Sequence, residues 1–469
     1  MPELSAGDTA WVLASAALVL LMTPGLALFY GGMVRAKGVL NMLMMNFAAI
    51  GVVSILWVLY GYSLSFSTDV GGGLIGGLGE VGLKGLLGEN SLVGTIPSTV
   101  FVAFQAMFAI ITVALISGAI ADRTKFSAWI VFIVAWATIV YFPVAHWVFF
   151  FDEGNGGWIA DRLKALDFAG GTAVHINAGA AGLALALVLG KRVGWRREPM
   201  RPHNLPLVLL GAGLLWFGWF GFNAGSALAA NHFAGVAFIN TQVATAAALL
   251  AWILVEKFRD GKATTLGAAS GAVAGLVAIT PACASVTPVG AILVGLVAGV
   301  LCALAVGLKT RFGFDDSLDV VGVHLVGGLA GTLLIGLLAS ATAPAGVAGL
   351  FYGGGFGQLW RQIVAAAAVL AYSFVLTYVI GKVIDKLMGF RISADDEVSG
   401  IDLAEHAETA YDFSTIGGGS RGHFMRETMS LRSEHGPSSS AEESTESAEK
   451  PAVDSAGESA EDKEGSVTR

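Results

Sequence analysis

Apolar segments as long as a bilayer is thick recur along most of this chain, and they constrain its fold more than any other feature. A transmembrane helix needs about 20 predominantly apolar residues. Charged residues make up 13% of the sequence, against about 25% in soluble globular proteins. The sequence therefore predicts an all-α polytopic membrane protein with eleven transmembrane helices, at residues 10–31, 40–62, 97–120, 127–150, 169–190, 205–228, 237–256, 264–283, 288–308, 319–340 and 362–388.

Lysine and arginine gather in every second loop between these segments, at 35–37, 122–125, 191–201, 256–262 and 309–311. Loops rich in positive charge stay on the cytoplasmic side of a membrane. The first apolar run lacks the basic residues that open a signal peptide, so we count it as a span. We expect a multi-pass protein of the plasma membrane with its N-terminus outside and its C-terminus in the cytoplasm.

The composition changes after the last apolar segment. Residues 1–390 are expected to form the transmembrane domain, and residues 391–415 are polar with a few apolar anchors. Residues 416–469 become rich in Ser, Glu, Ala and Asp and contain few large apolar side chains. Such a composition cannot bury a core, so we expect a disordered acidic tail there, either simply solvated or used for docking.

An aspartate precedes a histidine by eight positions in two apolar, glycine-rich segments. Asp167 precedes His175 in DFAGGTAVHINAGAAG, and Asp316 precedes His324 in DSLDVVGVHLVGG. The second segment lies five spans after the first, so the two copies cross the membrane in opposite directions. This pattern predicts inverted repeats with a site between them, namely two five-helix repeats and a final helix at about 10–190, 205–340 and 362–388.

Inverted copies of one element meet at their pseudo-two-fold axis, so we expect His175 and His324 to meet near the bilayer centre. A lone histidine on an apolar helix is often structural, but ionisable residues at symmetric membrane positions mark pathways. A neutral imidazole offers one donor and one acceptor, which can hold a small polar molecule or relay a proton. A zinc site competes with this interpretation, but two histidines without a close third ligand make a poor closed site.

Asp167 and Asp316 each lie at the start of a span. A carboxylate at that position can accept hydrogen bonds from exposed backbone N–H groups and favours the positive end of the helix dipole. Orienting the site and contacting a substrate directly are both open roles for these two residues.

Aromatic residues and one hydroxyl surround the same region. Trp219, Phe222 and Ser226 share one helix face because they are three and four residues apart. Phe104 and Phe108 are again four apart in FVAFQAMFAI. Composition leaves open whether these side chains line a passage or face lipid and core.

The sequence contains no pattern that indicates catalysis, metal binding or cofactor binding. It offers no nucleophile–base pair and no metal cluster, so we expect no enzyme, no catalytic residue, no metal and no cofactor. The stretch GGGLIG (71–76) matches a dinucleotide-binding pattern, but no strand precedes it and no βαβ unit follows. No nucleic-acid partner is expected.

Seven stretches together resemble one family, that of the ammonium transporters, methylammonium permeases and Rhesus proteins, over roughly residues 8–415. The match is nearest to its ammonium transporter branch. The stretches are LALFYGGMVRAKGVL (26–40), AFQAMFAIITVALISGAIADR (103–123), LDFAGGTAVHINAGAAGL (166–183), RPHNLP (201–206), WFGFNAGS (219–226), ITPAC (279–283) and DDSLDVVGVHLVGG (315–328).

The resemblance implies a homotrimer with one hydrophobic pore per subunit. Such a pore recruits NH4+ at an outer vestibule, removes its proton and conducts NH3, with methylammonium as an analogue. Desolvation favours the neutral form of a titratable cation, whereas potassium cannot shed its charge. The resemblance assigns vestibule roles to Trp219, Ser226 and Phe108, with Phe149 where many bacterial members carry tryptophan. It also assigns gate roles to Phe108 and Phe222, pore roles to His175 and His324, and a place near the site to Asp167.

GIDLAEHAETAYDF (400–413) resembles the cytoplasmic tail of this family. In the family that tail contacts neighbouring subunits, and many prokaryotic members are blocked there by a PII-type signal protein. Residues 391–415 are therefore expected to be a cytoplasmic regulatory segment. Two alternatives stay open: a Rhesus-like conductor of NH3 or CO2, and an ammonium sensor that signals through its tail.

Overall fold

The structure, a computed structural model, describes residues 3–412, and the expected acidic tail at 416–469 lies outside the described residues. Residues up to Tyr411 form one compact unit. Helices dominate this unit, and its short strands β1 (Leu92–Val93) and β2 (Ile96–Pro97) make one antiparallel pair in which Leu92 faces Pro97 and Val93 faces Ile96. The prediction of an all-helical polytopic membrane fold is confirmed.

Ten apolar helical segments between residues 3 and 412 are long enough to cross a bilayer. An eleventh, α10, has 15 residues and is shorter than the others, so the expected span at 264–283 is helical over Thr265–Ile279. The long helices are α1 (Ala6–Met33), α2 (Val39–Leu56) with α3 (Tyr62–Phe66), α4 (Ser98–Ile116), α5 (Phe126–Trp136) with α6 (Phe142–Phe149), α7 (Asn177–Leu189), α8 (Leu205–Gly225), α9 (His232–Asp260), α11 (Pro288–Ala305) with α12 (Leu308–Phe312), α13 (Val326–Leu338) and α14 (Gly357–Met388).

Several of these segments contain a wider π-helical turn. Such turns occur in η1 (Trp57–Gly61) and η4 (Ala137–Tyr141), and they begin the two histidine segments as η6 (Gly171–Ile176) and η7 (Val321–Leu325). A further π turn, η5 (Trp158–Leu163), lies in a connection between spans. π-turns are rare and gather at functional sites. The 3₁₀ turns are η2 (Val81–Leu83), η3 (Ser117–Ile120) and η8 (Leu350–Tyr352).

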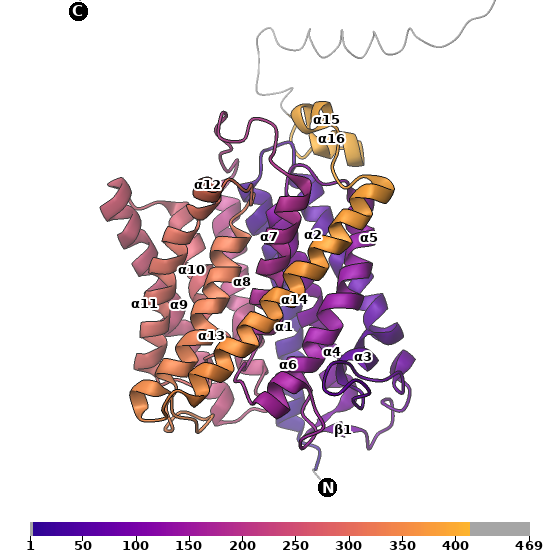
Figure 1. The fold of residues 1–469 in the computed structure, drawn as a ribbon, viewed down its shortest axis with the longest axis vertical. Helices are drawn as coiled ribbons and strands as arrows, with labels where there is room; N and C mark the ends of the chain where they lie inside the picture. Colours follow the sequence, from indigo (N-terminus) through magenta and orange to yellow (C-terminus); the bar gives the residue numbers. More distant parts are fainter. Residues whose placement is uncertain (1–2, 413–469) are drawn as a thin grey trace, which may run out of the picture. The chain divides into compact units, whose positions relative to one another are not determined.

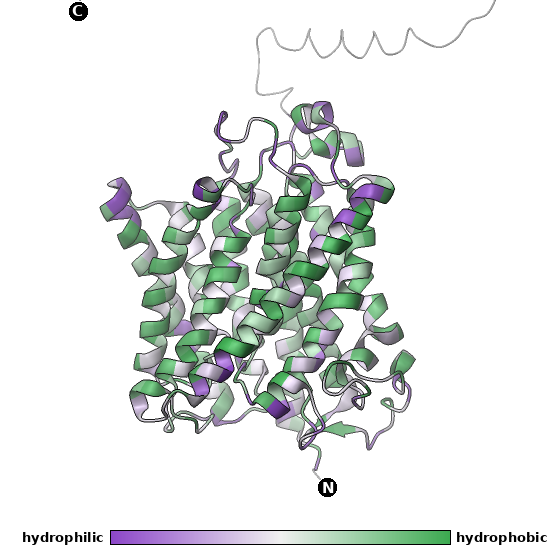
Figure 2. Cartoon of the chain, viewed as in Figure 1, coloured by the Kyte–Doolittle hydropathy of each residue, from purple (hydrophilic) through white to green (hydrophobic). Residues whose placement is uncertain are grey.

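The helices stand side by side, with β1 and the N-terminal residues at one end of the bundle and the short helices α15 (Ala394–Ser399) and α16 (Ile401–His406) at the other (Figure 1). We call these the β1 end and the α15 end. Apolar residues cover the middle of the bundle, and hydrophilic residues gather toward its ends (Figure 2). This distribution suits a bilayer, because lipid tails can solvate helices that are apolar on every side.

Two contacts in the bundle tie the chain's halves together. Helix α1 packs along α8, where a Cβ on Gly211 would come within 2.3 Å of Phe29 N. Small residues allow this close backbone approach between membrane helices. Helix α14 crosses the bundle diagonally (Figure 1) and packs against α7, α13 and α5.

The segment after α14 covers the α15 end. Its backbone pairs with the loop after α4, where Lys125 N–H donates to Phe390 O and Ile392 N–H donates to Arg123 O. The carboxylate of Asp402 accepts hydrogen bonds from Leu40 N–H (3.0 Å) and Asn41 N–H (2.8 Å), at the start of α2. The segment therefore holds the basic loop at 122–125 and the start of α2 in one assembly with the bundle.

Candidate functional site

The two histidines that share the eight-residue spacing lie against each other in the interior of the bundle. The Nδ1 atoms of His175 and His324 are 3.3 Å apart, and their rings lie 21° from parallel with centroids 5.4 Å apart. Both side chains are buried, with 1% and 3% of their surface exposed. At this distance one Nδ1 donates and the other accepts, so the two imidazoles adopt different tautomers.

Glycine allows the two histidine segments to approach closely. A Cβ on Gly179 of α7 would lie 2.5 Å from Leu325 N, and a Cβ on Gly328 of α13 would lie 3.1 Å from His175 Cβ. The contacts are reciprocal: η6 packs on α13, and η7 packs on α7. This is the arrangement expected where inverted copies of one element meet.

Each histidine segment is capped by the aspartate eight residues before its histidine. The carboxylate of Asp167 accepts hydrogen bonds from the backbone N–H groups of Gly170 (2.8 Å), Gly171 (2.6 Å), Thr172 (2.7 Å) and Ala173 (3.3 Å), and from the Thr172 hydroxyl. These donors satisfy the open backbone groups at the start of η6. The cap fixes the orientation of the turn that contains His175.

Asp316 caps the second segment with fewer contacts. Its carboxylate accepts from Val320 N–H (3.1 Å) and Val321 N–H (2.8 Å). Both aspartates thus lie at the start of their helices, at opposite ends of the bundle.

Next to the histidines, two phenyl rings close the interior toward the β1 end. The centroids of Phe108 and Phe222 are 4.3 Å apart, and Phe222 lies 6.1 Å from the His175 ring. Both phenyl side chains are fully buried. Phe149 lies 6.5 Å from Phe108 in an edge-on contact, so aromatic rings run in an unbroken file from Phe149 to the histidine pair.

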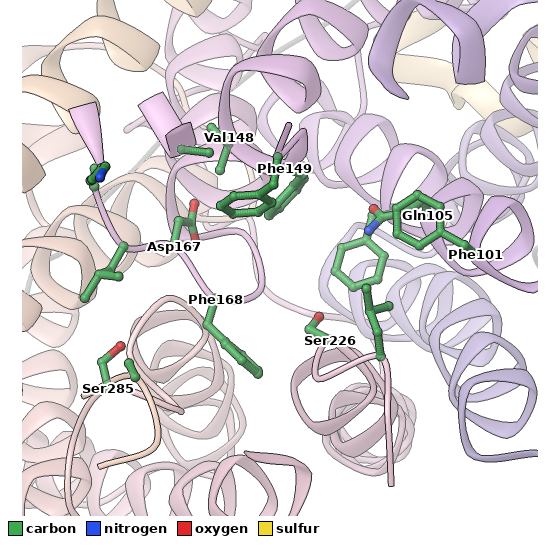
Figure 3. A pocket seen from close by; sticks show the side chains of 16 residues that line it. Phe101, Gln105, Val148, Phe149, Asp167, Phe168, Ser226 and Ser285 are labelled. Carbon is green, nitrogen blue, oxygen red and sulfur yellow. The ribbon is translucent and has the colours of Figure 1, made fainter. Parts of the chain in front are cut away.

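Beyond the phenyl pair, a cavity of about 350 Å³ opens at the β1 end; we call it the mouth cavity. Phe149, Asp167 and Ser226 stand around the same hollow (Figure 3). The Ser226 hydroxyl donates to Phe222 O (2.8 Å), which leaves its oxygen able to accept a hydrogen bond. The lining residues are Phe101, Gln105, Phe108, Val148, Phe149, Phe151, Ala160, Lys164, Ala165, Leu166, Asp167, Phe168, Ser226, Leu228, Ser285 and Ala345.

Trp219, expected at the vestibule, does not line the mouth cavity. It lies on the far side of Phe222, stacked 5.5 Å from His175, and its Nε1 donates to Thr280 Oγ1 (2.8 Å). Three residues along a helix advance its axis by about 4.5 Å, which places Trp219 one level deeper than Phe222. Trp219 therefore contacts the histidine pair rather than the mouth cavity, and its part in recruiting the cation stays a prediction.

A small hollow of about 10 Å³ adjoins the histidines on the far side of the phenyl rings. This volume is close to the minimum that holds one water molecule. Apart from Trp219 and the two histidines, its lining side chains are aliphatic or aromatic: Met22, Leu26, Ile111, Leu115, Val174, Leu215, Phe222 and Val273. His175 Nε2 is buried and has no hydrogen-bond partner among the described residues, so it can bind a small polar molecule in this hollow.

Two glutamines of α14 support the site and were not singled out from the sequence. Gln362 accepts from Leu166 N–H (2.7 Å) and donates to Leu166 O (2.7 Å), one residue before Asp167. Gln358 donates to Gln362 Oε1 (2.9 Å). Two glutamines four residues apart in an apolar helix share one face, and this spacing is a signal that could have identified them.

The part of the chain that the structure describes contains no group of three or more His, Cys, Asp or Glu side chains able to hold a metal ion. The interior offers an aromatic cavity with the hydroxyls of Ser226 and Ser285, a closed pair of rings and two mutually bonded imidazoles. Together these groups can select, desolvate and pass a small polar molecule.

Comparison with known proteins gives a consistent result. The model of the Ammonium Transporter Family matches residues 10–411. An ammonium transporter of Mycobacterium tuberculosis is 63% identical over 88% of this chain and 91% of its own, and one of Bacillus subtilis is 50% identical over 87% and 99%. Among solved structures, Candida albicans Mep2 superposes with a TM-score of 0.78 at 37% identity, over 87% of this chain and 91% of its own. The chain belongs to the ammonium transporter family.

Proposed function

We propose that this protein transports ammonium across the plasma membrane by capturing NH4+ in the mouth cavity and passing NH3 along His175 and His324. The observation that carries the proposal is the order of groups from the mouth cavity, through the closed phenyl pair, to the bonded histidine pair. Homologues named ammonium transporters support transport, rather than catalysis, as the general role.

The mouth cavity suits a small cation. The face of an aromatic ring attracts a cation by about 0.5–2 kcal/mol, and Phe149 and Phe108 present rings there. Phenylalanine is a weaker partner than tryptophan, so we expect modest affinity for the cation. The Ser226 oxygen supplies an acceptor for one ammonium N–H.

The interior beyond the phenyl pair does not suit an intact ion. Moving a bare cation into a low-dielectric medium costs tens of kcal/mol by a Born estimate, and one cation–π contact offsets about 2 kcal/mol. Desolvation favours the neutral form of a titratable cation, so NH4+ gives up a proton before NH3 enters the hollow beside His175. Potassium has no proton to lose and is excluded.

The histidine pair matches NH3 in its hydrogen-bonding groups. In a neutral pair, the histidine that donates through Nδ1 keeps an accepting Nε2, while its partner carries the proton on Nε2. The pair therefore offers one acceptor and one donor, and NH3 both donates and accepts. The same bond between the rings can pass the released proton separately from NH3.

We place the α15 end in the cytoplasm, because the basic segments with Arg35, Arg123 and Arg192 lie at that end and positive loops stay inside. The exposed apolar faces of α9 and α11 suit lipid or a neighbouring subunit, and a homotrimer is part of the proposal. A PII-type protein at the α15 end is the regulatory partner that we propose.

The test is uptake of methylammonium by purified protein in liposomes, with potassium flux and current recorded in parallel. His175→Ala and His324→Ala should each lower methylammonium uptake at least tenfold or admit potassium, because either change removes half of the bonded pair. His232→Ala serves as the control, since His232 is exposed and lines neither the mouth cavity nor the hollow beside the histidines. Unchanged uptake and unchanged selectivity in both pore variants would overturn the assignment of the pore.

A further inference from the structure

We propose that Lys164 sets the affinity of the mouth cavity for its substrate cation, by holding a fixed positive charge at the rim. The inference rests on the proposed function and adds to it a residue that opposes capture. Two charged side chains, Lys164 and Asp167, occur among the described residues that line this cavity. A cation that enters the cavity therefore approaches one like charge and one opposite charge.

The opposite charge, the Asp167 carboxylate, already accepts hydrogen bonds from its own segment. The Asp167 carboxylate accepts four backbone N–H groups and the Thr172 hydroxyl. These donors present their positive ends to both carboxylate oxygens. Asp167 is thus stabilised as a helix cap, and much of its negative field is offset before a substrate arrives.

The charge of Lys164 is only weakly compensated, by the nearby Asp161 carboxylate. Within residues 3–412, no carboxylate lies within ion-pair distance of its ammonium group, whereas the neighbouring Arg162 lies 3.7 Å from Asp69. The carboxylate of Asp161, on the same turn, accepts the backbone N–H groups of Asp152, Gly154 and Gly156. The Lys164 charge is therefore available to act on the cavity.

The backbone holds Lys164 in one place. Its φ of 57° and ψ of 39° are left-handed, a conformation that L side chains adopt at a cost of roughly 1–2 kcal/mol. The Lys164 carbonyl accepts a hydrogen bond from Gln358 (3.5 Å), and Gln362 fixes the peptide of Leu166 two residues later. Lysine rather than glycine at a strained, well-fixed rim position points to a use for its side chain, since such strain gathers at functional sites.

The physical effect follows from Coulomb's law. A fixed positive charge several ångströms from a bound cation, at a dielectric between those of protein and water, weakens binding by about three- to tenfold. The effect acts on capture, so it changes the apparent KM for the cation and leaves the maximal rate of passage along the histidines little changed. Salt screens exposed charges, so the effect diminishes at high ionic strength.

The experiment compares methylammonium uptake by Lys164→Gln, Lys164→Arg and Lys164→Glu in liposomes at low and high concentrations of an impermeant salt. We expect Lys164→Gln to lower KM about three- to tenfold at low salt and Lys164→Glu to lower it further. Lys164→Arg should resemble the wild type, and the differences should shrink at high salt.

Arg162→Gln is the matched control, because Arg162 is an exposed cation on the same segment and does not line the cavity. Its KM should stay within about twofold of the wild type. The inference is overturned if Lys164→Gln leaves KM unchanged, or if Arg162→Gln lowers it equally, which would indicate a diffuse surface charge. If the wild type itself moves no methylammonium, the proposed function fails instead. Should Lys164→Glu not fold, Lys164→Gln carries the test.

Discussion

The two histidine segments share one local pattern and lie in very different surroundings. At the β1 end, Asp167 faces the mouth cavity and accepts five hydrogen bonds from its own segment. At the α15 end, Asp316 is 1% exposed and accepts two. The same aspartate-to-histidine spacing therefore ends in an open cavity on one side and in a sealed layer on the other.

Charged side chains from several parts of the sequence seal the α15 end. Arg123 is fully buried and donates to Ser317 Oγ (2.6 Å) and Asp315 O (2.6 Å). Arg192 binds the Asp315 carboxylate through two guanidinium nitrogens (2.9 Å each) and also contacts Asp122 (3.3 Å). Burial lowers the pKa of Arg123 to about 10, so the guanidinium stays charged at neutral pH.

The repeat sets the position of each histidine, whereas the segments that cover each end decide whether that end is open. At the β1 end a single linker, fixed by Gln362, covers Asp167. At the α15 end two loops and the segment after α14 converge, and the Glu397 carboxylate accepts from Val193 N–H (2.6 Å) beside Arg192. Variants at the two ends should therefore have unequal effects.

Arg192→Ala should have the largest effect on stability. It removes one member of a buried ion pair and leaves Asp315 without its main partner, a change that costs about 3–5 kcal/mol. The measurement is the unfolding temperature of the purified protein, reported by a thiol-reactive dye on Cys283 and Cys302, both of which are buried. Arg197→Ala is the control, because Arg197 is exposed in the same loop. Equal unfolding temperatures for the two variants would mean that the ion pair does not hold this end together.

Asp167→Ala should have the next largest effect and lower the free energy of unfolding by about 2–4 kcal/mol, because four backbone N–H groups and a hydroxyl lose their acceptor. Water in the mouth cavity replaces some of these bonds, which keeps the loss below that of Arg192→Ala. Asp316→Ala should lower the free energy of unfolding by about 1 kcal/mol. Two N–H groups lose their acceptor, but the loss is limited because a buried carboxylate is removed at the same time. The same dye assay measures both variants, and a larger loss for Asp316→Ala would reverse the comparison of the two ends.

The sequence was sufficient for ten of the eleven expected spans and for the contact between the two histidines, and the reasons are physical. The length of the apolar segments and the charge of the loops are set by the bilayer. The eight-residue spacing that recurs five spans later is set by the symmetry of the repeats. Both predictions can therefore be made without knowing how the side chains pack. The depth of Trp219 depends on how α8 packs against its neighbours, and the π turns at His175 and His324 depend on tertiary contacts that widen a helix locally. The spacing of Gln358 and Gln362 indicates a polar face on α14, but the contact of Gln362 with Leu166 depends on the diagonal course of α14, which no local pattern encodes.

The smallest predicted effect concerns pH at the sealed end. Burial, and next the negative charge of Asp319, raise the pKa of Asp316 to about 6, although Lys309 opposes this. The folded protein then binds more protons at this carboxyl than the unfolded chain does between about pH 4 and pH 6. Its contribution to the free energy of unfolding therefore falls as the pH rises through that window.

Asp316→Asn removes the titrating group while keeping one oxygen that accepts from Val320 or Val321. Relative to the wild type, its free energy of unfolding should rise by about 1 kcal/mol between pH 5 and pH 7, because a shift of one pKa unit corresponds to 1.36 kcal/mol. Unfolding temperatures measured across this range test the expectation, with Asp152→Asn, at an exposed loop residue, as the control. A constant difference between Asp316→Asn and the wild type would show that burial does not raise the pKa of Asp316. The α15 end would then not be sealed around this carboxyl.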